Sequence, residues 1–263
     1  MQGANKLHIM PTGSSTRLRA SDITVAIALL TRLPVSADHR RGARAAWAWP
    51  VAGAVIALIS VVVGQIVYAL GLPATLAGLV VVACSIVLTG GMHEDGLADC
   101  ADGFWGGFDP QRRLNIMKDS AIGTYGTLAL ALVVIGKWIS IVMLIQADSL
   151  AGAFVAAAAL SRGAMVWVMH HLEPARRHGL SHSVGRPDKS TVLMTAACAL
   201  VLSLLATAFW TIPALIAAIV LTLAVAAIAR AKINGQTGDV LGATQQITEL
   251  GILMVLAAGL AAG

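Results

Sequence analysis

ATLAGLVVVACSIVLTGGMHEDGLADCADGFWGG (residues 74–107) joins a run of uncharged, mostly apolar residues directly to a cluster of acids and glycines. The first part has the composition of a membrane-spanning helix, which needs about 20 apolar residues. The second part, residues 90–107, holds four carboxylates, one histidine and six glycines. The stretch therefore predicts a membrane protein that places a group of acids at the end of an apolar helix.

The composition of the whole chain supports this prediction. Of the 263 residues, 57% are hydrophobic and only 12% are charged, whereas a soluble domain carries about 25% charged residues. The formal net charge of +5 could indicate a nucleic-acid partner. However, the basic residues lie between apolar runs, so membrane topology explains them better. We therefore expect an integral protein of the lipid bilayer and no nucleic-acid partner.

The apolar runs predict an all-α fold, a polytopic bundle of transmembrane helices. About seven runs could span a bilayer: 47–70, 74–92, 124–146, 149–171, 191–210, 212–229 and 246–262. The segment 21–34 is too short to cross and predicts an N-terminal interfacial or re-entrant helix. We expect a disordered extension over residues 1–20 and a single integral membrane domain over 21–263.

The basic residues divide the connections between these runs into two classes. All but two of the 18 lysines and arginines lie in four polar segments: 1–46, 93–123, 172–190 and 230–245. The short connections hold none of them: 71–73, 147–148 and 211. Because lysine and arginine accumulate on the inner side of a membrane, the polar segments, the N-terminus and the active site are predicted to face the cytoplasm.

The acids of the opening stretch have a helical spacing. On a helix continuing from the span, Asp95, Asp99 and Asp102 fall within about 60° of arc, while Glu94 points elsewhere. Three carboxylates on one face repel each other unless a cation lies among them, and Mg²⁺ prefers such oxygens. The spacing favours a Mg²⁺ site; the alternatives are a solvated acidic face or a capping cluster for the next helix.

Neighbouring residues supply further candidates for this site. His93 adjoins the three aspartates and could be a base, a phosphate donor or a bystander. Arg113 and Lys118 in the following segment would suit the anionic oxygens of a substrate. Asp119 could be another metal ligand, or it could cap the helix of the third predicted span.

A second loop, NGQTGDVLGA (234–243), resembles the first in style, because it combines glycines, a small hydroxyl and one aspartate. It belongs to the same predicted side of the membrane. Asp239 could be a fourth carboxylate that holds a second cation, or only a turn residue. Gln236 and Thr237 are predicted to contact substrate.

Two basic residues lie inside predicted spans. Lys137 and Arg162 would be expensive to expose to lipid, so we expect them to face a polar interior of the bundle. There they could contact a phosphate or another polar part of a substrate. The structural alternative is that they pair with an acid or with a carbonyl at a helix end.

The motifs together resemble those of the cobalamin 5'-phosphate synthase family, also called adenosylcobinamide-GDP ribazoletransferases. The central motif GGMHEDGLADCADG is the most specific, and the likeness covers roughly residues 22–257. It continues, in chain order, through other segments: TRLPV and WPVAG before the central motif, and RRLNIMKDSAIGTYGTLAL, GKW, LSRGA and GQTGDVLGA after it.

The resemblance implies a Mg²⁺-dependent transferase of the cytoplasmic (inner) membrane. Such an enzyme joins adenosylcobinamide-GDP to α-ribazole or its 5'-phosphate, and gives adenosylcobalamin or its 5'-phosphate plus GMP. Asp95, Asp99 and Asp102 would then serve in catalysis, and one of them or His93 would accept the hydroxyl proton. Further partners would be a second copy of the chain or other enzymes of cobalamin synthesis.

Two other function classes share parts of this pattern. A CDP-alcohol-type phosphotransferase of lipid synthesis also carries aspartates on a membrane helix, but its full signature is missing here. A cation transporter should carry its acids near the middle of the membrane, often in two repeated halves. The clustering of acids at one end and the lack of an internal repeat argue against a transporter.

Overall fold

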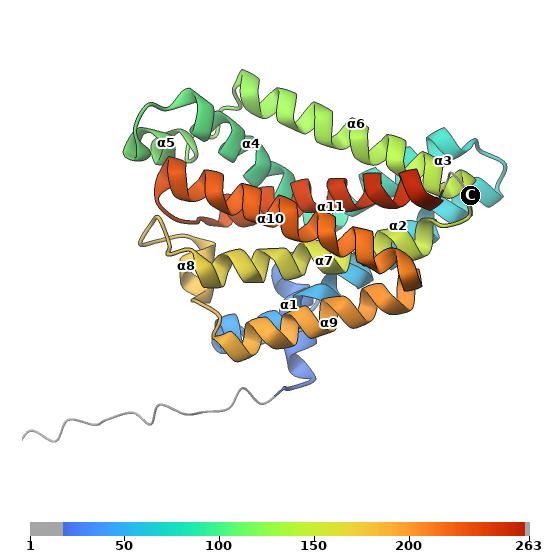
Figure 1. Cartoon of the computed structure of the whole chain (residues 1–263), viewed down its shortest axis with the longest axis horizontal. Helices are drawn as coiled ribbons and strands as arrows, with labels where there is room; N and C mark the ends of the chain where they lie inside the picture. The colour runs from blue at the N-terminus through green and yellow to red at the C-terminus, as the bar shows by residue number, and fades with distance from the viewer. Residues whose placement is uncertain (1–17, 261–263) are drawn as a thin grey trace, which may run out of the picture.

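The structure, a computed structural model, describes residues 18–260 and confirms the all-α fold class within that range (Figure 1). A single isolated bridge joins Pro174 to Gln236, and no strand forms among the described residues. The predicted disordered extension lies, except for residues 18–20, outside them. The helices are α1 (Ser21–Leu30), η1 (His39–Ala48), α2 (Trp49–Ala69), α3 (Ala74–Thr89), α4 (Met92–Gly106), α5 (Pro110–Ile116), α6 (Thr124–Gln146), α7 (Leu150–His171), α8 (Leu180–Val184), α9 (Lys189–Thr207), η2 (Ala208–Trp210), α10 (Thr211–Ile233) and α11 (Gly238–Leu260).

The long apolar helices make the chain a multi-pass membrane protein. Five described stretches are long and apolar enough to cross a bilayer, or six if the bent pair of α3 and α4 is one span. One of the five, Lys189–Ile233, reverses at Ala208 (φ +46°), so that α9 and α10 run in opposite directions. Large apolar side chains such as Leu132 and Leu205 point outward, as expected for a lipid-facing surface. The exact number of seven spans stays a prediction.

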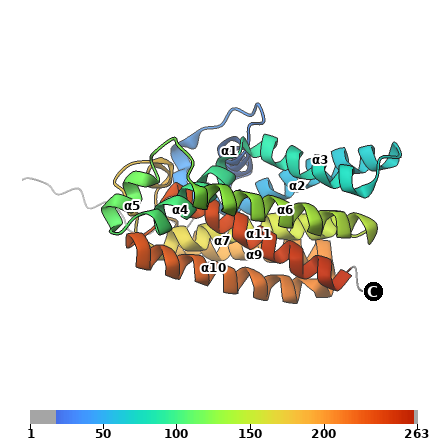
Figure 2. The ribbon, with the colours of Figure 1, turned by 90° about the horizontal axis from the view of Figure 1, so that it is seen from above.

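The connections segregate to the two ends of the bundle. The long polar segments, with α5 and α8, lie at the end where α11 begins, and the short connections 71–73 and 147–148 lie at the other (Figures 1 and 2). This confirms that the polar segments 93–123, 172–190 and 230–245 share one side. Their orientation relative to the cytoplasm stays a prediction.

The centre of the bundle is built from small residues. In α7, 83% of the residues in its most apolar stretch are buried, compared with 33% in α6, so α7 is central and α6 peripheral. At Gly53 of α2, a Cβ atom would lie 2.5 Å from the carbonyl oxygen of Ala158 in α7. Small residues at such crossings allow helix backbones to approach closely, as is common in membrane proteins.

The acidic helix does not continue straight from the preceding span, so that expectation was wrong. Gly90 and Gly91 adopt left-handed backbone angles (φ +67° and +70°), and α3 and α4 meet at 88°. Glycine adopts this conformation without steric cost, which ends the helix there. The chain after α1 packs on this break, because the Arg32 N–H donates to the Leu88 carbonyl at 2.7 Å. The turn directs α4 toward the polar end of the bundle.

The turned helix α4 packs against the start of α11 with almost no side chain between them. A Cβ atom on Gly96 would lie 2.8 Å from the carbonyl oxygen and 2.9 Å from the Cα atom of Asp239. On α11, a Cβ atom on Gly242 would lie 3.1 Å from the carbonyl oxygen of His93. The two glycines therefore bring the acidic stretch and the 234–243 loop together.

We predict that Gly96→Ala destabilises the protein, because the added methyl group must push the backbones of α4 and α11 apart. Overpacking of this kind costs about 1–3 kcal/mol, although helix propensity alone favours alanine over glycine. The measurement is thermal unfolding in detergent. Gly106→Ala is the matched control in the same helix, since its Cβ would lie 3.7 Å from the nearest atom, in Ile116. Equal unfolding temperatures for the two variants would contradict the contact.

Candidate functional site

A polar pocket lies at the polar end of the bundle, between α4, the segment after α7 and the start of α11. Its volume is about 220 Å³. Its polar lining comes from three segments that are distant in sequence: Asp95 from α4, Arg176, His178, Ser181 and His182 from the segment after α7, and Gln236, Thr237 and Asp239 at the start of α11. The predicted residues Asp95, Gln236, Thr237 and Asp239 are thus brought together.

Gln236 fastens two of these segments to each other. Its backbone N–H donates to the carbonyl of Glu173 at 2.9 Å, and its own carbonyl accepts from the N–H of Ala175 at 2.8 Å. The side-chain oxygen of Gln236 accepts from the Ser181 hydroxyl at 2.7 Å. Gln236 is buried and already engaged, so the structure explains it as an anchor of the pocket wall, and its contact with substrate stays a prediction.

Asp239 lies in the first turn of α11 rather than in a turn, and its role as a fourth carboxylate stays a prediction. The Thr237 hydroxyl accepts from the N–H of Val240 at 3.3 Å and donates to Asp239 at 3.1 Å, which caps the helix. A guanidinium nitrogen of Arg176 lies 3.3 Å from the same carboxylate. The helix N-terminus and Arg176 both stabilise negative charge here.

Two of the α4 aspartates face Asp239. Asp95 is exposed and lines the pocket, while Asp99 is half-buried. The Asp99 carboxylate feels the like charges of Asp239 and Asp95 and the opposite charge of Arg176. Three carboxylates thus share one nearby arginine, and this excess of negative charge favours a bound cation.

The fit of these acids to a metal ion is partial. Among residues 18–260, no three His, Cys, Asp or Glu side chains converge closely enough to form a complete metal site. Mg²⁺ does not need a complete protein cage, because it usually keeps several waters and binds one or two carboxylates together with substrate phosphates. The Asp95, Asp99 and Asp239 cluster therefore suits a Mg²⁺ ion that the substrate helps to hold.

Asp102 faces α6 rather than the pocket. Its carboxylate accepts from the N–H groups of Gly123 and Gly126, at 2.7 and 2.9 Å, and so caps the start of α6. The possibility that Asp119 caps this helix is therefore wrong. Asp119 is exposed and accepts from the Ala121 N–H at 3.2 Å in the preceding turn. Asp102 and Asp119 line a separate shallow pocket. The predicted face of three aspartates is therefore divided, because Asp102 is separated from Asp95 and Asp99. Metal binding by Asp102 and Asp119 stays a prediction.

Arg113 ties two helices together at the polar end. Its side chain donates to the carbonyls of Gly107 and Lys232, at 3.0 and 2.9 Å, which fastens α5 to the end of α10. Lys118 is exposed outside the pocket lining. Substrate contacts by Arg113 and Lys118 stay predictions.

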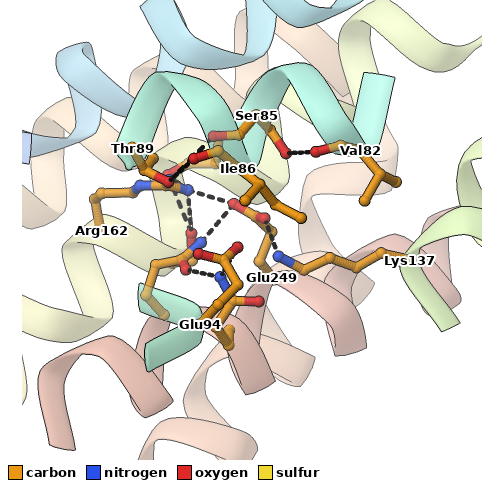
Figure 3. Close-up of polar contacts among 12 residues, drawn as sticks. Val82, Ser85, Ile86, Thr89, Glu94, Lys137, Arg162 and Glu249 are labelled. Carbon is orange, nitrogen blue, oxygen red and sulfur yellow. Dashed lines mark hydrogen bonds and ion pairs between the residues drawn. The ribbon is translucent and has the colours of Figure 1, made fainter. Parts of the chain in front are cut away.

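Lys137 and Arg162 are buried inside the bundle, as expected, and both pair with Glu249 of α11 (Figure 3). The Lys137 ammonium lies 2.7 Å from one oxygen of Glu249, and Arg162 contacts the other. The Gln245 amide also donates to Glu249 at 2.6 Å. The structural alternative, pairing with an acid, is therefore present, whereas phosphate contact stays a prediction. Glu249 was missed, although a lone acid in an apolar run was a signal for it.

His93 lies on the inner face of α4, toward Glu249 and Arg162, and is 1% exposed. It does not line the polar pocket, so its role as a base stays a prediction without support from its position.

Three basic residues of the segment after α7 do line the polar pocket: Arg176, His178 and His182. From the sequence, the two histidines are predicted to be solvated, and Arg176 either to set topology or to attract an anionic nucleotide. The structure places all three in the pocket lining, where both histidines are exposed. The sequence did carry a signal for their place in the pocket. Their segment, 172–190, belongs to the same class of polar connections as the acidic segment 93–123.

Fold and pocket together define a multi-pass membrane protein with a charged pocket at one end, which is the class of a membrane-embedded enzyme for a charged substrate. The family model described as cobalamin-5-phosphate synthase matches residues 22–257. The chain belongs to this family, and it is a transferase of late cobalamin biosynthesis. Membership in this family argues against a lipid phosphotransferase and against a cation transporter.

Relatives support the assignment over nearly the whole chain. An adenosylcobinamide-GDP ribazoletransferase of Sinorhizobium sp is 43% identical, over 90% of this chain and 95% of the relative. Relatives with the same description from Mesorhizobium japonicum and Brucella canis are 39% and 43% identical, over 94% and 81% of this chain and 96% and 85% of theirs. No solved structure matches the chain.

We predict that Asp102→Ala lowers the unfolding temperature, because two N–H groups at the start of α6 lose their acceptor. Loss of a cap costs roughly 0.5–2 kcal/mol. The decrease should be the same in EDTA and in Mg²⁺, since the bonds involve the protein alone. Asp119→Ala is the control and should leave the temperature unchanged. A decrease that occurs only in Mg²⁺ would show that Asp102 acts as a metal ligand instead.

Proposed function

We propose that the polar pocket joins adenosylcobinamide-GDP to α-ribazole or its 5'-phosphate, and releases GMP. The names of the relatives support this choice of substrates. The observation that carries the proposal is the meeting of Asp95, Asp99 and Asp239 with Arg176 at the polar end. A pocket with several carboxylates and one guanidinium suits a pyrophosphate accompanied by a cation.

The proposed reaction is a displacement at phosphorus. A hydroxyl oxygen of ribazole bonds to the phosphorus on the cobinamide side, and the bond from that phosphorus to the bridging oxygen breaks. GMP leaves with the bridging oxygen and its negative charge. The hydroxyl proton passes to a carboxylate, and we assign this role to Asp95 because it is the exposed aspartate of the pocket.

We propose Mg²⁺ as the cofactor, held by Asp239 together with Asp95 or Asp99, with water and substrate phosphates as its other ligands. When bound, it supplies positive charge to the phosphate oxygens. Arg176 contributes a second positive charge from the side of Asp239. The Thr237 bond to Asp239 keeps that carboxylate at the start of α11, where it can meet the other two.

We also propose that this pocket faces the cytoplasm from the inner membrane. The distribution of lysine and arginine supports the orientation, because they are abundant in the polar segments and absent from the short connections. In this orientation the pocket opens to the compartment that holds nucleotides.

The test is GMP release by the purified protein from adenosylcobinamide-GDP, with α-ribazole or its 5'-phosphate and Mg²⁺. Asp99→Asn should reduce kcat roughly 100-fold or more, because a metal-assisted displacement gains several kcal/mol from its cation. Asp148→Asn is the matched control at the opposite end of the bundle, where asparagine tolerates the local φ of +50°. It should leave kcat unchanged.

GMP release by the wild-type protein tests the choice of substrates, and the Asp99→Asn variant tests the place of Asp99 in the site. If the wild-type protein releases no GMP, the proposed substrates are wrong. If it does release GMP and Asp99→Asn retains near-normal kcat with an unchanged unfolding temperature, Asp99 is not part of the site.

A further inference from the structure

A second, much smaller cavity lies inside the bundle behind the first turn of α4. It is enclosed by α2, α3, α4, α7 and α11, and its volume is about 10 Å³. Its polar lining includes His93, Glu94, Arg162, Gln246 and Glu249. Figure 3 shows three of them, Glu94, Arg162 and Glu249. None of these residues lines the polar pocket, so this cavity is separate from the proposed active site.

Polar atoms without a partner concentrate around this cavity. In the described part of the chain, eight buried side-chain atoms have no hydrogen-bond partner, and five of them belong to residues of this lining. They are both ring nitrogens of His93, Oε2 of Glu94, Nε of Arg162 and Oε1 of Gln246. His93, Arg162 and Gln246 are at most 2% exposed. An unpartnered buried polar group costs about 1–3 kcal/mol, so the cluster favours a ligand.

The size and charge of the cavity select the ligand. A cavity must offer roughly 10–15 Å³ to hold one water molecule, so there is room for a single small ligand. Two cations, Lys137 and Arg162, balance two acids, Glu94 and Glu249. An added cation would meet the N–H of Arg162, and an added anion would meet the carboxylate of Glu94. A neutral molecule that both donates and accepts hydrogen bonds fits best.

Water has the matching set of donors and acceptors. It can accept from the Nε–H of Arg162 and from one N–H of neutral His93, and it can donate to Glu94 and Gln246. Gln246 already donates to Glu94 at 2.8 Å, which connects α11 to α4 beside the cavity. One bound water would therefore extend an existing contact between the two helices to α7.

The first turn of α4 links this cavity to the proposed active site. His93 and Glu94 line the cavity, while their neighbours Met92 and Asp95 line the polar pocket. The two middle residues of this helical turn thus face the cavity, and the two residues that flank them face the pocket. Whatever fixes His93 and Glu94 also fixes the position of Asp95 relative to Asp239.

We propose that this cavity binds one water molecule between His93, Glu94, Arg162 and Gln246, and that the water-bridged cluster positions the α4 aspartates for the cation. His93, Glu94 and Gln246 are then positioning residues, because they act through α4 and do not touch substrate. The presence of the water does not depend on the proposed reaction, whereas the effect on cation binding rests on the proposed function.

The first test is a structure at a resolution that shows ordered waters, determined on the full chain in detergent or nanodiscs. We expect one peak within hydrogen-bond distance of at least three of the four side chains. Closure of the cavity by direct side-chain contacts would overturn the proposal, as would a peak that anomalous scattering identifies as a metal ion.

The second test measures binding of Mn²⁺, as a probe for the Mg²⁺ site, by the EPR signal of free Mn²⁺. His93→Leu should weaken Mn²⁺ binding about 10-fold, as for other residues that position metal ligands, with more than half of kcat retained at saturating Mg²⁺. His93→Gln keeps a donor and an acceptor and should restore most of the affinity. Thr248→Val is the control, because Thr248 is a buried, unpartnered residue of α11 outside this lining.

The outcomes are distinguishable. Wild-type affinity in a folded His93→Leu variant would overturn the positioning role, and so would an equal loss in Thr248→Val. If His93→Leu does not fold, Glu94→Gln replaces it, with a smaller loss expected and wild-type affinity as the contradicting result. If the wild-type protein itself binds no Mn²⁺, the metal role in the proposed function fails, while the peak in the first test still decides the water.

Discussion

The structure depends on one contact, the close packing of α4 on the first turns of α11. Gly96 lies against the backbone of Asp239, and Gly242 lies against the backbone of His93. Because almost no side chain separates these helices, the residues of α4 and α11 that flank the contact lie close to each other. The aspartates meet Asp239 on the outer side, and the polar cluster around Glu249 forms on the inner side. The sharp turn at Gly90 and Gly91 makes this contact possible, since it directs α4 toward the polar end of the bundle, where α11 begins.

Three buried charges inside the bundle, Lys137, Arg162 and Glu249, form one cluster. Glu249 sits between Lys137 and Arg162, and Gln245 donates to it as well. Desolvation makes a buried ion pair costly to form, but removal of one partner costs about 3–5 kcal/mol because it leaves a buried charge. These contacts join α6, α7 and α11, so they specify which helices are neighbours in a core that is otherwise built from small apolar side chains.

Helical periodicity and the distribution of charge predict a good part of this arrangement. They identified the apolar helices, the shared side of the polar segments and the interior position of Lys137 and Arg162. Of the predicted acidic face, Asp95 and Asp99 lie together, but Asp102 does not join them. Periodicity and charge could not predict that Asp102 caps α6, because its acceptor role depends on glycines more than 20 residues away. The bend at Gly90 and Gly91 was also missed, since glycine is compatible with a continuous membrane helix. Arg176 and Glu249 carried weak signals in the sequence, a basic residue in a polar segment and a lone acid in an apolar run. Their contacts with Asp239 and with Lys137 and Arg162 needed the tertiary structure.

We propose that the packing of α4 on α11 creates a cation site at Asp95, Asp99 and Asp239. Anomalous diffraction from crystals soaked in Mn²⁺ and a guanosine diphosphate would locate the ion, and its position distinguishes the two acidic pockets. We expect a Mn²⁺ peak within coordination distance of Asp239 and at least one of Asp95 and Asp99. A peak at Asp102 and Asp119 instead, with none beside Asp239, would contradict it.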